Sequence, residues 1–174
     1  MRCLFLLILL FLSPIGIAQK SFTDQFNYLA TYRYTYQLDS TDISSKKSEN
    51  MLLYLGKESS QFSSAGTAAR EQILKAPKRA GRNSADFKRI QAATPNTSIH
   101  YTIYKHYPSS AMSFTESIAL EDFRYSQELG QLLWKIGMEQ KEINGYQAQK
   151  ATAKFAGRDY VAWFTPEIPA PDGP

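Results

Sequence analysis

The stretch "FNYLATYRYTYQ", residues 26–37, changes character at every second position. In a β-strand successive side chains point to opposite faces, so this alternation sorts the residues into two sets. One set is aromatic or small and consists of Phe26, Tyr28, Ala30, Tyr32, Tyr34 and Tyr36. The other set is mostly polar. The stretch therefore predicts a strand with one packed face and one hydrated face, and a β-rich fold.

Strand patterns continue on both sides of a helix-like segment. Further strands are predicted over residues 50–56, 60–64, 98–107, 113–120, 122–127, 132–137, 146–155 and 160–168. No connection after Pro95 is long enough for a crossover helix, so neighbouring strands should pair antiparallel. We expect a mainly β fold (β-rich α+β) with a single curved antiparallel sheet of about eight strands and a short helical insertion.

The helical insertion is expected over residues 66–76 and 84–93, with Pro77 ending the first helix and Ser84 capping the second. Between Arg70 and Arg89 seven basic residues accompany two acidic ones, which gives this segment a charge of +5 in a chain of net charge +4. Such a segment could bind phosphate-bearing lipid or polysaccharide. We favour a solvated excursion. It lacks the interleaved aromatic residues that single-stranded nucleic acid requires, so no nucleic-acid partner is expected.

The amino terminus has the pattern of a secretory signal peptide over residues 1–18. Arg2 precedes the apolar run "CLFLLILLFL", and small residues precede a cleavage point after Ala18. The run is shorter than the roughly 20 residues of a membrane-spanning helix, so we expect cleavage and no transmembrane segment in the mature chain. Cys3 is the first residue of this run and does not lie at the cleavage point, where a lipoprotein cysteine must be, so lipidation is not expected. The prediction is a periplasmic or secreted protein without disulfides.

Motifs for catalysis, metal binding or cofactor binding are not recognisable in this sequence. His100 and His106 share one predicted strand but would lie about 20 Å apart, too far to bind one ion. Glu139 and Glu142 fall in a predicted polar turn. There is no Gly-x-Ser-x-Gly elbow and no glycine-rich phosphate loop. We therefore expect no catalytic residues, no metal and no cofactor.

Aromatic residues are the remaining candidates for a binding site. The candidate ligand-binding residues are Tyr32, Tyr34, Tyr36, Trp134 and Trp163. They could line a groove for an apolar or sugar ligand, or they could form half of the core, which we favour for the stripe on residues 26–37. A curved sheet allows both, because it buries part of its concave face and leaves a trough.

The closing stretch "NGYQAQKATAKFAGRDYVAWFTPEIPAPDGP", residues 144–174, resembles the signature of the GLPGLI family, a group of exported bacterial proteins. The matching positions include Gly157, Arg158, Ala162, Trp163, Phe164, Thr165, Ile168, Pro169, Gly173 and Pro174. In that family Gly-Pro leads directly into the name-giving motif and further strands. The length and the strand pattern of residues 19–174 indicate a single β-rich domain. The resemblance implies that this domain lacks its C-terminal strands. It implies no established activity.

Local chemistry explains much of this signature. Residues 161–164 are apolar on both faces, which predicts a central strand. Small Ala151 and Ala153 on the neighbouring strand would leave room for bulky side chains. Gly157 is expected to adopt a positive φ that closes the turn between the two strands.

Together these observations favour a non-catalytic cell-envelope protein that binds an apolar ligand or an envelope protein partner on a curved β-sheet. The alternatives are a hydrolase whose site is assembled from scattered side chains, and a structural component of an outer-membrane complex. The sequence does not set the oligomeric state.

Overall fold

The computed structural model describes residues 25–75, 85–106, 110–118, 121–170 and 172–174. The expected signal peptide, Cys3, Ser84 and the centre of the basic segment lie outside these residues. The fold is mainly β, with 54% strand and 14% helix. All strand pairs are antiparallel, as predicted.

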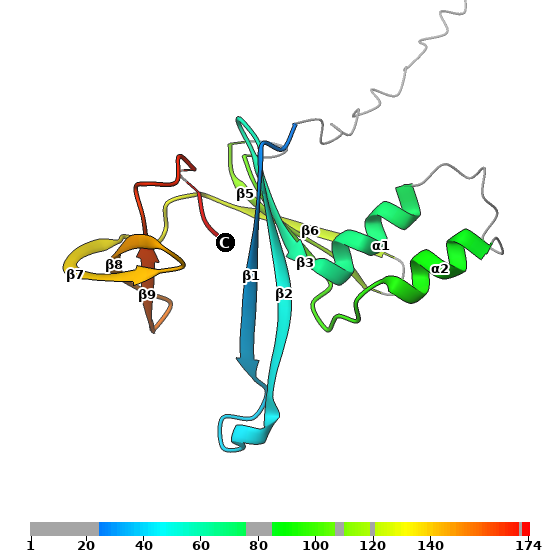
Figure 1. The fold of residues 1–174 in the computed structure, drawn as a ribbon, viewed down its shortest axis with the longest axis horizontal. Helices are drawn as coiled ribbons and strands as arrows, with labels where there is room; N and C mark the ends of the chain where they lie inside the picture. The colour runs from blue at the N-terminus through cyan, green and yellow to red at the C-terminus, as the bar shows by residue number, and fades with distance from the viewer. Residues whose placement is uncertain (1–24, 76–84, 107–109, 119–120, 171) are drawn as a thin grey trace, which may run out of the picture.

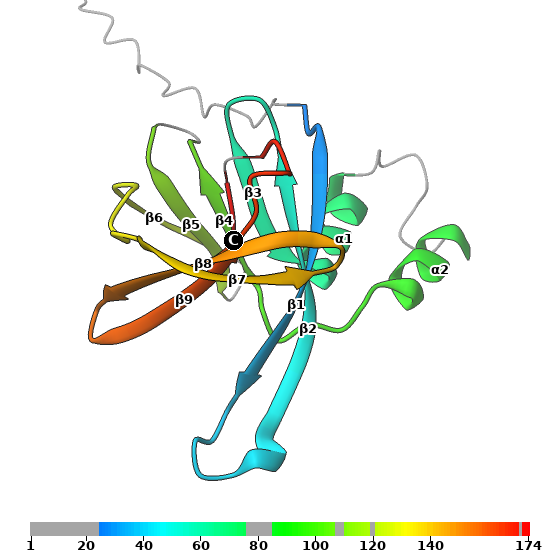
Figure 2. The ribbon, with the colours of Figure 1, turned by 60° about the vertical axis from the view of Figure 1, so that its left-hand side comes forward.

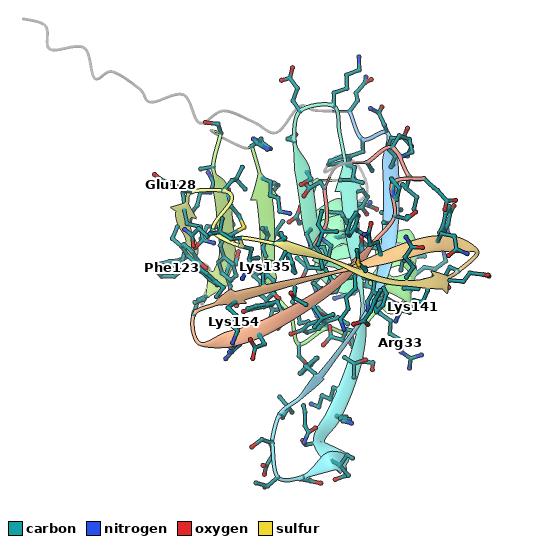
Figure 3. All side chains as sticks on the ribbon, turned by 90° about the vertical axis from the view of Figure 1, so that its left-hand side faces the viewer. Arg33, Phe123, Glu128, Lys135, Lys141 and Lys154 are labelled. Carbon is teal, nitrogen blue, oxygen red and sulfur yellow. The ribbon has the colours of Figure 1, made fainter. Side chains whose placement is uncertain are left out.

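The strands form two sheets. A six-stranded sheet in sequential order contains β1 (Tyr28–Gln37), β2 (Lys46–Leu55), β3 (Ser60–Ser64), β4 (Tyr101–Lys105), β5 (Met112–Ile118) and β6 (Glu121–Gln127). A three-stranded sheet contains β7 (Lys135–Ile143), β8 (Tyr146–Phe155) and β9 (Arg158–Phe164). The prediction of a single sheet is therefore wrong. Residues 128–134 carry the chain away from β6, and β7 starts a sheet that crosses the first one (Figure 3).

The predicted helical insertion is confirmed between β3 and β4. It consists of α1 (Ala65–Lys75) and α2 (Ala85–Ala93), on the side of the six-stranded sheet that faces away from the three-stranded sheet (Figure 1). Ser64 caps α1, since its Oγ accepts a hydrogen bond from the Thr67 amide at 3.0 Å. Of the helices in the described ranges, neither has the length and apolar content needed to cross a bilayer.

The best-buried part of the molecule lies on β2 and β3. Met51 and Leu53 of β2 are 0% and 1% exposed, and Ser63 and Ser64 of β3 are similarly buried. β2 pairs with β1 on one side and β3 on the other, while α1 contacts both β2 and β3. The apolar residues of β2 are therefore covered from several directions.

Two local predictions about strands are wrong, and one is confirmed. Glu139 and Glu142 lie within β7 and not in a turn, because the chain turns two residues later, at Asn144-Gly145, where both φ angles are positive. β9 is an edge strand and not a central one, and Val161 is 58% exposed. Gly157 has the expected positive φ of 73°, in a two-residue turn that joins Phe155 to Arg158.

Candidate functional site

One face of the six-stranded sheet collects aromatic side chains from five strands. Directly paired residues share a face, and a single row of pairs crosses all six strands: Ala30, Leu53, Phe62, Ile103, Phe114 and Tyr125. The aromatic residues of this face are Tyr28, Tyr32, Tyr34, Tyr36, Phe62, Tyr101, Phe114, Phe123 and Tyr125. We refer to this surface as the aromatic face.

The rings of the aromatic face contact one another across the strands. Phe114 lies between Tyr101 and Tyr125, with centroid distances of 4.9 and 5.0 Å and ring planes 31° and 22° apart. Tyr32 meets Phe62 edge to face at 6.3 Å. Tyr125 is 56% exposed, whereas Phe114 is half-buried. The face is therefore packed like a core at its centre and open at its β6 end.

The C-terminal segment returns to the aromatic face beside β3 and β4 (Figure 2). The Asp172 carboxylate lies 2.6 Å from the Lys105 Nζ and accepts a hydrogen bond from the Ser60 Oγ. Lys105 also donates to the Gly173 carbonyl at 2.6 Å. Ser60 and Lys105 are directly paired between β3 and β4, so adjacent strands provide both anchoring groups.

The electrostatics of this anchor follow from its burial. Burial alone would raise the pKa of Asp172, but the hydrogen bonds from Lys105 and Ser60 outweigh it and lower that pKa. Burial, together with the negative charge of Asp172, raises the pKa of Tyr32 on the same face. Asp172 is therefore held as a carboxylate, and the Tyr32 phenol is held neutral.

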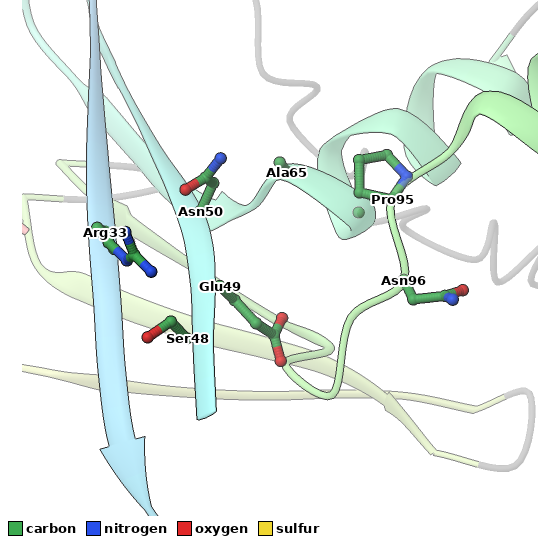
Figure 4. A pocket seen from close by; sticks show the side chains of 8 residues that line it. Arg33, Ser48, Glu49, Asn50, Ala65, Pro95 and Asn96 are labelled. Carbon is green, nitrogen blue, oxygen red and sulfur yellow. The ribbon is translucent and has the colours of Figure 1, made fainter. Parts of the chain in front are cut away.

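A pocket of about 280 Å³ lies at the edge of the sheet near the start of α1 (Figure 4). Its lining residues are Arg33, Ser48, Glu49, Asn50, Ala65, Gly66, Pro95 and Asn96. The Glu49 carboxylate accepts hydrogen bonds from the Tyr36 hydroxyl, the Thr97 hydroxyl and the Ser98 amide. Burial would raise the pKa of Glu49, but these bonds lower it. Glu49 thus fastens the segment before β4 to β2, which is a structural role.

The predicted ligand-binding residues are only partly brought together. Tyr32, Tyr34 and Tyr36 do share the aromatic face. Trp134 lies in the segment between the two sheets, and Trp163 lies on β9 under the Lys141 ammonium, whose Nζ is 4.0 Å from the ring centroid. Neither tryptophan belongs to the six-stranded sheet.

Sequence reasoning missed the aromatic residues that the later strands contribute. Phe62, Phe114 and Tyr125 form the crossing row, yet each lies in a different short strand. Their alternation with polar neighbours was the available signal. The strand register was also needed to place them on the face of Tyr32.

The signature residues form a hairpin and the returning segment. Ala162 pairs with Ala151, Trp163 with Lys150 and Phe164 with Gln149. The described residues that follow, 165–170 and 172–174, lie between β9 and the six-stranded sheet (Figure 1). Much of this stretch therefore has an evident architectural role.

Histidines and carboxylates do not gather at one place in the described part of the chain. His100 directly precedes β4 and His106 directly follows it. Neither lies within the strand, so the prediction that both do is wrong. No group of three or more His, Cys, Asp or Glu side chains among the described residues is placed to hold a metal ion. No protein-family model, no curated protein and no solved structure matches this chain. The resemblance to the GLPGLI family therefore stays a prediction.

Proposed function

We propose that this chain is a non-catalytic exported protein of the GLPGLI type that binds an apolar ligand on the aromatic face. The supporting observation is the row of cross-strand rings that is half-buried at its centre and open at the β6 end. Surfaces of this kind, apolar and bordered by a few polar groups, are typical of ligand sites. Polar groups on this face include the Asp172–Lys105 pair and Glu116, which is paired with Tyr101 and Phe123.

The ring geometry favours an apolar ligand over a sugar. A sugar stacks on the free face of an aromatic ring, but both faces of Phe114 are directed at neighbouring rings. With both of its faces taken up, Phe114 can offer a ligand only its ring edge, as part of an apolar surface. A flexible acyl chain, or an apolar segment of an envelope protein, gains most from such a surface because burial of its apolar area needs no ring face.

The test is a titration of the purified chain with the apolar dye 1-N-phenylnaphthylamine, followed by fluorescence. Replacing Tyr34 or Tyr125 by Ser removes a ring from opposite ends of the aromatic face. We expect at least one of these changes to weaken dye binding about fivefold, since loss of a partly exposed ring costs roughly 1 kcal/mol. A fatty acid should displace the dye, and an oligosaccharide should not.

The matched control is Tyr146→Ser. Tyr146 lies on β8 of the other sheet and is 41% exposed, against 42% for Tyr34. This control should leave dye binding unchanged. Equal losses in all three variants, or no loss at either end of the aromatic face, would argue against a ligand site there.

A further inference from the structure

β6 leaves one complete edge of the six-stranded sheet open. No described strand pairs with its outer side, and the strand lies at the periphery of the molecule (Figure 2). Phe123 projects at this margin and is 52% exposed (Figure 3). An edge strand presents unpaired amide and carbonyl groups, which makes it a template for another strand.

The charges on β6 suit pairing with a strand that places a basic residue opposite Asp122 and an acidic residue opposite Arg124. Asp122 and Arg124 are two residues apart, on the face opposite the aromatic face. Their hydrogen bonds go to neutral hydroxyls of β5: Ser117 donates to Asp122, and the Arg124 Nε donates to Thr115 at 3.2 Å. In the described part of the chain neither charge has an ion-pair partner. Each therefore remains available to an incoming opposite charge.

We propose that two copies of this chain associate by antiparallel pairing of β6 with β6, centred on Phe123. In this register Asp122 of each copy lies opposite Arg124 of the other, which makes two equivalent opposite-charge pairs. The two Phe123 side chains lie opposite each other on the aromatic face. A register centred on Arg124 would instead place the two guanidinium groups opposite each other. Of these two registers the charges favour the one centred on Phe123, and in that register the aromatic faces of the two copies are continuous.

Two other edge strands lack this complementarity. On β1 Arg33 is the only charged residue, so self-pairing there brings no opposite charges together. On β9 the charges belong to Arg158 and Asp159, which are neighbours and point to opposite faces. Asp159 is already paired with Lys154 at 3.3 Å.

β7 carries a similar charge order but is unsuited to pairing. Glu139 is engaged by Lys150 at 2.8 Å, and Lys141 lies over the ring of Trp163. The strand also has a register shift between Ile136 and Gln140. Such irregularities bend an edge and hinder the docking of a further strand.

A charge exchange tests the proposed register. Sedimentation velocity over a concentration series should show a reversible dimer for the unaltered chain. Asp122→Arg places like charges opposite each other, as does Arg124→Asp, and each should raise the dissociation constant at least about tenfold. The double variant Asp122→Arg/Arg124→Asp restores two opposite-charge pairs and should restore the dimer. Arg33→Asp on the opposite edge is the control and should have no effect.

Cross-linking tests the centre of the pairing independently. In a Cys3→Ser background, Phe123→Cys should give a disulfide-linked dimer on mild oxidation, because directly opposed side chains have Cβ atoms about 5 Å apart. Tyr125→Cys lies two residues from the centre and should not cross-link. A chain that stays monomeric at every concentration, a double variant that fails to dimerise while remaining folded, or equal cross-linking at both positions would overturn the proposal.

Discussion

Asp172 ties the returning C-terminal segment to the six-stranded sheet through Lys105 and Ser60. Replacing Asp172 by Asn keeps the size of the side chain but leaves the Lys105 ammonium without its counter-charge. We expect the free energy of unfolding at neutral pH to fall by about 1.5–3 kcal/mol, the range for hydrogen bonds to charged groups. Urea unfolding measures this change. Asp159→Asn removes an exposed ion pair and should cost less than about 0.5 kcal/mol.

The same residue makes a prediction about pH. The pKa of Asp172 is lower in the folded chain than in the unfolded chain. Its stabilising contribution is therefore complete above the unfolded value of about 4, and is lost as the pH falls through the folded pKa. The stability difference between the unaltered chain and Asp172→Asn should shrink when unfolding is repeated at about pH 3. A constant difference would mean that the carboxylate charge is not what anchors the segment.

Gly66 is required by a close approach between α1 and the segment before β4. A Cβ at this position would lie 2.5 Å from the Pro95 carbonyl oxygen and 2.8 Å from the Thr97 Cγ2. Helix propensity alone would favour alanine by about 1 kcal/mol, but overpacking costs about 1–3 kcal/mol. Since Pro95 presents backbone, we expect Gly66→Ala to lower the unfolding free energy by about 1–2 kcal/mol.

A second glycine provides the control for this prediction. A Cβ at Gly137 would meet only the Lys150 carbonyl oxygen at 3.5 Å, an ordinary contact. Gly137→Ala should therefore change the unfolding free energy by less than about 0.5 kcal/mol. If Gly66→Ala is neutral or stabilising in the same assay, α1 and its neighbouring segment are not packed as described.

At the scale of elements, the two turns of the three-stranded sheet differ in how well their first residues tolerate a positive φ. Asn144-Gly145 joins β7 to β8 with φ of 53° and 84°, and Ala156-Gly157 joins β8 to β9 with φ of 48° and 73°. Asparagine tolerates this left-handed conformation better than alanine. Ala156→Asn should stabilise the chain by up to about 1 kcal/mol, which raises the Tm by about 2–4 °C. Ala156→Val should lower the Tm, and a fall with Asn would contradict the assigned turn.

Strand predictions succeeded where turns or caps bounded a buried pattern. β3 and β8 begin and end where the sequence predicted, since β3 is almost fully buried and β8 lies between two turns. β7 was misplaced because all of its residues except Ile143 are exposed. With no buried face, its sequence has no alternation to reveal it. The strand was therefore predicted from the apolar residues Leu132 and Trp134, which lie in the segment before β7.

The candidate site was predictable only within one strand. The alternation of β1 placed Tyr32, Tyr34 and Tyr36 on one face without further information. Phe114 and Tyr125 joined them only through four successive strand registers, which no local pattern contains. The tryptophans were chosen by residue type alone, and the structure places both outside the aromatic face.

At the scale of the whole molecule, the division into two sheets depends on the seven residues between β6 and β7. A segment of this length could equally close a wide hairpin within one sheet. Gly130, with a φ of 82°, and the exposed residues around it redirect the chain instead. Local periodicity predicts strands, but it does not decide which sheet a strand joins. The antiparallel pairing was therefore predictable, and the number of sheets was not.

The two sheets should also differ in local stability. The six-stranded sheet holds Met51 and Leu53, which are almost fully buried, whereas the buried residues of the three-stranded sheet are Ala148, Ala151 and Ala153. Alanine removes much less apolar area from water than methionine or leucine does. The three-stranded sheet thus has the smaller hydrophobic contribution and should open below the free energy of global unfolding.

Native-state amide hydrogen exchange, read by mass spectrometry, measures this difference. Peptides from β7, β8 and β9 should exchange at least about tenfold faster than peptides from β2 and β3, because a difference of roughly 1.4 kcal/mol in opening free energy corresponds to a factor of ten. Asp172→Asn should speed exchange at Gly173, which the Asp172 anchor holds on the sheet, and should leave β2 unchanged. Equal protection of the two sheets would show instead that they unfold as one cooperative unit, with the second sheet stabilised by contacts beyond its own small core.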